Sequence, residues 1–148
     1  MIISITKIVC GVLLALWGIG TLISCRQDVY NKFSKISLDD VYNMYNFNPN
    51  NSRSIFKFSY LIGQIYQLFI MEMLLLAYTK QPLFLYPFVI YLIGYLVEFS
   101  QFLYLKHSFK YNYHRLIYSF SYERNIPNLV EDVSKGVAYV TMGIILIF

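Results

Sequence analysis

The sequence predicts an all-α membrane protein with three transmembrane helices, a short candidate fourth helix, and a long inner loop between the first two helices. Two observations lead to this class. The 148 residues are 57% hydrophobic and only 14% charged, whereas soluble domains carry about 25% charged residues. The apolar residues are also gathered into runs close to the ~20 residues that a membrane-spanning helix needs. We therefore predict a single membrane domain over residues 1–148.

The first span is predicted at residues 2–24. Gly11, Gly18 and Gly20 give it a side of small residues, along which another helix can approach closely. The run Leu22-Ile23-Ser24-Cys25 also resembles a lipoprotein cleavage box. However, the preceding apolar stretch is longer than the about 7–15 residues of a signal-peptide core, so a span is the favoured interpretation.

The second and third spans are predicted at residues 58–78 and 82–105. Only Thr79-Lys80-Gln81 separates them, which indicates an antiparallel hairpin. Residues 130–148 are the candidate fourth span. Its strictly apolar part, 134–148, would reach only about 22 Å as a helix, less than the ~30 Å thickness of the hydrocarbon core.

The segments between the spans are basic. Ten of the twelve Lys and Arg residues fall within 25–57 or 106–135. The positive-inside rule therefore places the loops 25–57 and 106–129 on the inner side, with the N-terminus outside. The aromatic residues interleaved with the basic ones after residue 106 indicate a segment that lies in the interface or on a partner, without a nucleic-acid motif.

Three local expectations concern these inner loops. The run Ser37-Leu38-Asp39-Asp40 is expected to cap one helical turn through residues 41–45. The Asn- and Pro-rich run at 46–51 is expected to end it as a turn. His107 and His114 stand alone among basic residues, so both are expected at the solvated surface or in contact with lipid headgroups.

Two carboxylates fall within the predicted spans. A carboxylate at the centre of a membrane helix costs about 2.5–3.5 kcal/mol on insertion scales, so Glu72 and Glu98 are functional candidates. Glu72 shares an apolar helix face with leucine and isoleucine side chains, a setting that suits a group that takes up and releases a proton. Glu98 lies near the inner end of the third span, one helical turn before Gln101.

Structural explanations for these polar residues remain open. Glu72 is also placed to pair with Lys7, because both lie in the outer half of the predicted topology. Glu98 equally suits a structural role, as an anchor at the membrane interface or as a partner in a helix–helix hydrogen bond. Gln64 and Gln67 suit interhelical hydrogen bonding. We predict no catalytic residue and no metal site, because the sequence has no nucleophile–base pair, phosphate loop or metal-ligand spacing.

Five short motifs follow one another along the chain: Phe47-Asn48-Pro49, Ser52-Arg53, Phe58-Ser59-Tyr60, Phe69-Ile70-Met71-Glu72, and the run 94–99 around Glu98. With these motifs, residues 1–105 resemble subunit 3 of the proton-pumping NADH:ubiquinone oxidoreductase, respiratory complex I. Two departures stand out. Met44, Tyr45 and Asn46 occupy the place of a Glu-Cys-Gly motif, and Ile70 replaces an aspartate.

The resemblance implies a role as a non-redox subunit of the proton-translocating enzyme. Glu72 and Glu98 would belong to its proton path, and a loop near the quinone cavity would include Tyr45, Asn46, Phe47, Pro49 and Arg53. Other subunits would hold ubiquinone, FMN and the iron–sulfur clusters, so this chain itself would bind no cofactor. Its partners would be the other membrane subunits, the quinone-module subunits and membrane lipids, without nucleic acid. Its location would be the mitochondrial inner membrane, with the N-terminus on the intermembrane-space side, or a bacterial inner membrane.

Two alternatives stay open. One is a structural subunit of another organellar membrane complex, in which every polar side chain serves packing. The other is a small membrane protein similar to the VanZ-like group, suggested by Glu98-x-x-Gln101 and by a short last span that contains Gly136 and Gly143.

Overall fold

A computed structural model of the chain describes residues 2–25, 36–44 and 49–148. Within these ranges the chain is helical and contains no strand. The elements are α1 (Ile2–Ser24), α3 (Leu38–Met44), α4 (Pro49–Lys80), the 3-10 turn η1 (Pro82–Phe84), α5 (Leu85–Ser108), α6 (Tyr113–Ser121) and α7 (Ile126–Ile147). Among the described helices, α1, α4 and α5 are long and apolar enough to cross a membrane. This agrees with the predicted all-α membrane class.

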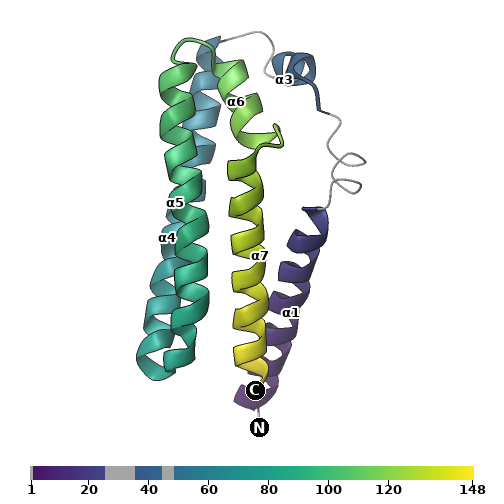
Figure 1. Cartoon of the computed structure of the whole chain (residues 1–148), viewed down its shortest axis with the longest axis vertical. Helices are drawn as coiled ribbons and strands as arrows, with labels where there is room; N and C mark the ends of the chain where they lie inside the picture. The colour runs from purple at the N-terminus through teal and green to yellow at the C-terminus, as the bar shows by residue number, and fades with distance from the viewer. Residues whose placement is uncertain (1, 26–35, 45–48) are drawn as a thin grey trace.

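The four long helices are arranged in the order α1, α7, α5, α4, each packed on the next (Figure 1). The α4–α5 turn and both termini lie at one end of the molecule, which we call the hairpin end. The short helices α3 and α6 lie at the opposite end, the α6 end. The predicted antiparallel hairpin of the second and third spans is confirmed.

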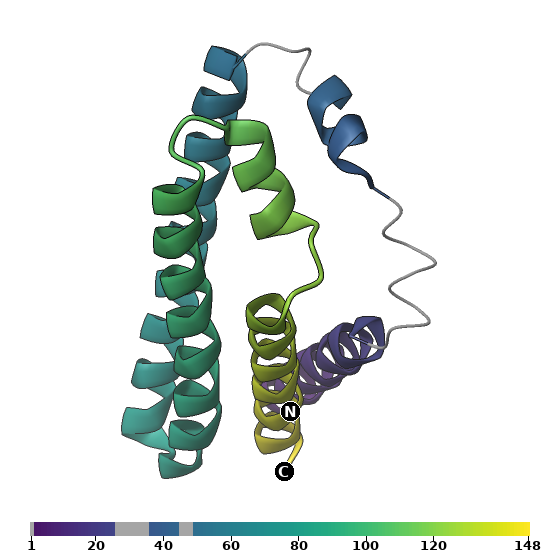
Figure 2. The same ribbon diagram turned by 45° about the horizontal axis from the view of Figure 1, so that its top comes forward.

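Helix α1 packs on α7 through closely opposed glycines. A Cβ atom added at Gly18 would lie 2.6 Å from the carbonyl oxygen of Gly136, and one added at Gly143 would lie 2.5 Å from that of Gly11. The small-residue side predicted for the first span is therefore confirmed at Gly11 and Gly18. It is wrong at Gly20, where an added Cβ would meet nothing within 4 Å. Figure 2 shows α1 crossing α7 on the side away from α4 and α5.

Helix α4 begins at Pro49, nine residues before the predicted start of the span at residue 58. Proline is favoured in the first turn of a helix, since its fixed φ suits the helix and its missing N–H has no intrahelical partner there. The Pro49 run therefore starts a helix rather than forming only a turn. Residues 49–57, which were predicted as the end of the inner loop 25–57, therefore belong to α4.

The segment 106–129, predicted as an inner loop, is largely helical, because it contains α6 and the start of α7. Asn112 and Asn125 explain both helices: each side-chain oxygen accepts a hydrogen bond from the backbone N–H three residues on, at 3.0 Å and 2.9 Å. These are N-caps, which satisfy donors that the helix leaves unpaired. Helix α7 consequently includes Glu131, Asp132 and Lys135 within one 22-residue element.

The α6 end has its own small core, which includes His114. The His114 side chain is buried, its Nε2 lies 3.2 Å from Ser52 Oγ, and its ring centroid lies 4.6 Å from that of Tyr42. The predicted surface position is therefore wrong for His114 and right for the exposed His107. The helix α6 explains the difference, because it turns His114 toward α3 and α4.

A cap is found within the predicted run 37–40, but α3 begins at Leu38, three residues before the predicted turn. The Ser37 backbone N–H donates to Asp40 Oδ2 at 2.7 Å, and the Asp40 N–H donates to Ser37 Oγ at 3.1 Å. This reciprocal arrangement is a capping box, which satisfies two backbone donors at the helix start. It fixes where α3 begins and lets Val41 enter the core of the α6 end.

Candidate functional site

The interior of the helix row holds a cluster of polar side chains centred on Glu98 of α5. Glu98 is 6% exposed. Gln64 Nε2 donates a hydrogen bond to Glu98 Oε1 at 3.2 Å, and Gln67 Nε2 donates to Glu98 Oε2. Gln64 and Gln67 are three residues apart on α4, a spacing that places both on one helix face. The interhelical hydrogen bonding expected of these glutamines is therefore observed, with Glu98 as the acceptor.

Helix α7 completes the cluster with Lys135, which forms two ion pairs: one with Glu98 of α5 and one with Glu131 of its own helix. Lys135 Nζ lies 2.8 Å from Glu98 Oε2 and 2.6 Å from Glu131 Oε1. Glu131 and Lys135 are four residues apart, so one face of α7 presents both. We call Gln64, Gln67, Glu98, Glu131 and Lys135 the Glu98 cluster; it joins α4, α5 and α7.

The charges of the Glu98 cluster do not balance when all its groups are ionised. Two carboxylates face one ammonium group, which leaves one negative charge in excess. The three side chains are only 7–17% exposed, and removing charges from water is costly unless they are paired. One additional proton makes the cluster neutral.

An aromatic-walled cavity of about 340 Å³ adjoins Glu98 on the side of the α6 end. Tyr60 lines it and stacks on Phe102, with ring centroids 3.8 Å apart, while Phe120 meets both rings edge-on. Within the described residues, the Tyr60 hydroxyl and Gln67 Oε1 are buried without a hydrogen-bond partner. Buried polar groups are normally hydrogen-bonded. The Tyr60 hydroxyl and Gln67 Oε1 can therefore each form a further hydrogen bond next to Glu98.

Glu72 lies apart from the Glu98 cluster. Its side chain is exposed on α4, on the same face as the exposed Ile65, Leu68 and Leu75. No hydrogen bond or ion pair reaches it from any described residue. The structure therefore separates the two predicted proton-transfer residues: Glu98 lies inside the chain and Glu72 on its surface.

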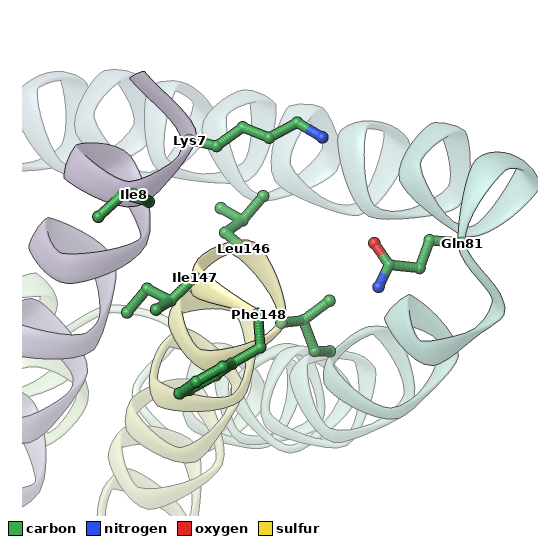
Figure 3. Close-up of a pocket in the computed structure, with 7 residues that line it drawn as sticks. Lys7, Ile8, Gln81, Leu146, Ile147 and Phe148 are labelled. Atoms are coloured by element: carbon green, nitrogen blue, oxygen red, sulfur yellow. The ribbon is translucent and has the colours of Figure 1, made fainter. Parts of the chain in front are cut away.

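The alternative pairing of Glu72 with Lys7 is not found among the described residues. Lys7 instead lines a cavity of about 220 Å³ at the hairpin end, together with Gln81 and the last residues of α7. Figure 3 shows Lys7 and Gln81 on opposite sides of this cavity, with Phe148 below them.

The predicted quinone-cavity loop is described only in part. Tyr45, Asn46 and Phe47 lie outside the described residues. Pro49 is the first residue of α4, and Arg53 lies in the next turn, with its Cζ atom 5.6 Å from the ring centroid of Tyr113. Arg53 is thus held against α6 at the α6 end of the molecule.

Lys135 and Glu131 are the cluster residues that the sequence did not single out. Their four-residue spacing after an Asn-capped, Pro-containing start indicates a helical ion pair. Nothing in the sequence alone says that this helix face meets Glu98, because that contact depends on how α7 packs on α5.

No protein-family model, curated protein or solved structure matches this chain. The fold and the cluster together define the class: a helical protein with three candidate membrane spans and a buried ionic cluster shared by three helices.

Proposed function

We propose that this chain is a membrane-embedded subunit of a larger assembly and that its Glu98 cluster takes up and releases one proton. The observation that carries the proposal is the composition of the cluster. Two carboxylates share one ammonium group away from water, so binding one proton neutralises the site. Ionisable groups of this kind within membrane helices are a common feature of proton relays.

The exposed position of Glu72 supports the subunit role. A lone carboxylate facing lipid carries the insertion cost of about 2.5–3.5 kcal/mol. A polar partner helix that covers this face of α4 removes that cost by pairing with the carboxylate. Proton transfer would then run between Glu98 inside this chain and Glu72 at the subunit boundary.

The specific assembly that we propose is the membrane arm of respiratory complex I, in the mitochondrial inner membrane or a bacterial inner membrane. This rests on the resemblance of the α4 and α5 motifs to subunit 3 of that enzyme. In this arrangement the α6 end faces inward, and α7 is a fourth membrane helix. Its 22 residues correspond to about 33 Å.

Isolation of the tagged chain from its native membranes tests the assembly. We expect it to migrate with an NADH-oxidising complex on native gels. Isolation of the chain with a different membrane complex would support the structural-subunit alternative. Isolation of the chain alone would support a free-standing protein such as the VanZ-like group.

The variant Glu98→Gln tests the proton role in the assembled complex. The substituted amide keeps the shape of the side chain and most of its hydrogen bonds, but it leaves Glu131 and Lys135 as a neutral pair that needs no proton. We expect normal assembly with loss of NADH-driven proton translocation. The matched control is Asp39→Asn, which alters an exposed carboxylate of α3 outside the cluster.

Infrared titration separates proton binding from packing. The protonated carboxyl band of the unaltered protein is expected to change with pH and to be lost in both Glu98→Gln and Glu131→Gln. If Glu98→Gln removes assembly, the cluster is structural. If it leaves both assembly and translocation unchanged, the proton role is wrong.

A further inference from the structure

A basic cavity at the α6 end is distinct from the Glu98 cluster. It has a volume of about 520 Å³. Its basic lining comes from two separate stretches of the chain: Arg53 from α4, and Lys106, His107 and Lys110 from the end of α5 and the turn that follows it. Three permanent positive charges therefore surround one space.

These cations have no anionic partner within the described part of the chain. Neither of the two ion pairs observed there involves Arg53, Lys106 or Lys110, and no carboxylate lines the cavity. Like charges gathered in one place repel one another, so this arrangement favours an anion from outside the chain.

Aromatic rings hold the cations in position. Arg53 Cζ lies 5.6 Å from the Tyr113 centroid, and Lys110 Nζ lies 5.1 Å from that of Tyr111. Cation–π contacts orient positive groups without neutralising them. The charges therefore remain available for an anion.

The position of the cavity identifies the kind of anion. Leu103 also lines it, belongs to the candidate span Pro82–Ser108, and is 50% exposed. The cavity thus opens from basic side chains onto the apolar surface of a membrane helix. An anionic phospholipid matches both parts, with its phosphate beside the cations and its acyl chain along α5. Basic pockets at the membrane boundary bind such headgroups.

We propose that this cavity binds the phosphate headgroup of an anionic phospholipid. A soluble phosphate compound fits the cations but gains nothing from Leu103 and the adjoining apolar surface. The site is independent of the proposed proton role, since it shares no residue with the Glu98 cluster.

Lipid retention by the full chain tests the proposal. The protein is purified in detergent micelles that contain either phosphatidylglycerol or phosphatidylcholine, and bound lipid is counted by native mass spectrometry. We expect retention of phosphatidylglycerol and not of phosphatidylcholine. Glycerol phosphate at the same concentration is the soluble competitor, and we expect it not to displace the lipid.

Charge-matched variants locate the binding. Lys106→Gln/Lys110→Gln is expected to weaken phosphatidylglycerol binding about fivefold per lost cation, or about 25-fold in total. The control, Lys57→Gln/Lys80→Gln, removes the same charge from exposed lysines outside the cavity. If both variants weaken phosphatidylglycerol binding equally, the lipid does not bind in this cavity. If phosphatidylglycerol is not retained, or if glycerol phosphate displaces it, the assignment of the ligand as a phospholipid is wrong.

Discussion

The Lys135 ammonium lies 2.8 Å from the Glu98 carboxylate and so joins α7 to α5 by an ion pair. It is the only ion pair between different helices within the described residues. Because α1 packs on α7, this contact also helps to attach α1 to the α4–α5 hairpin. The pair therefore adds to the apolar packing that holds α7 on α5.

Lys135→Met is expected to lower the free energy of unfolding by about 3–5 kcal/mol, since removing one partner of a buried pair leaves the other charge uncompensated. Denaturant titration in mixed micelles measures the change. The control Lys57→Met alters an exposed lysine, and its effect should stay within about 0.5 kcal/mol. Equal effects of the two variants would show that the ion pair is energetically unimportant.

The excess carboxylate of the Glu98 cluster predicts that a second substitution restores part of the stability lost in Lys135→Met. In Lys135→Met, Glu98 and Glu131 both lose their ammonium partner. The double variant Glu131→Gln/Lys135→Met should therefore unfold at a higher denaturant concentration than Lys135→Met alone, because one of the two unpaired carboxylates is gone. A double variant that is less stable than the single one contradicts this account of the cluster.

The glycine contact between α1 and α7 is tested by a matched pair of alanine substitutions. Gly18→Ala should destabilise the protein by about 1–3 kcal/mol, because its Cβ would lie 2.6 Å from a backbone oxygen. Gly20→Ala places its Cβ in open space and should stabilise α1 by up to about 1 kcal/mol through helix propensity. The same unfolding titration measures both, and a loss of stability at Gly20 would contradict the packing described.

The capping box before α3 predicts a pH effect outside the membrane spans. Hydrogen bonds from the Ser37 N–H and hydroxyl hold the pKa of Asp40 below its ordinary value of 3.8. The contribution of the cap is therefore complete above that value and is lost as pH falls through the lowered folded-state pKa. Hydrogen exchange at the amides of α3 should show this loss in acid, and Asp40→Ala should remove the pH dependence.

Glu72→Leu separates folding from assembly. Glu72 is exposed and contacts no described polar partner, so the isolated chain should keep its stability within about 0.5 kcal/mol. In native membranes we expect less of the variant chain to be recovered with its complex. Met73→Leu, a neighbouring exposed substitution, is the control and should leave recovery unchanged.

Hydrophobic runs predicted the long helices well, and α1 occupies the predicted residues 2–24. The beginnings of α4 and α7 were missed for a physical reason. Pro49 and Asn125 resemble turn formers, yet both also start helices, and only the packing of the following residues decides between these roles.

The sequence predicts only part of the candidate site. A carboxylate in an apolar run is costly, so Glu98 is recognisable as a functional candidate. Lys135 is counted among the basic residues of the preceding segment, and nothing near it in the sequence marks it as a partner of Glu98. Its pairing depends on contact between α5 and α7, and no local pattern encodes that contact.

The glycine contact between α1 and α7 has a consequence for biogenesis. Gly18 is translated well before Gly136, so the face of α1 that packs on α7 is made before its partner helix. Truncation of the chain before α7 should therefore leave this face of α1 without the glycine contact that it makes in the full chain.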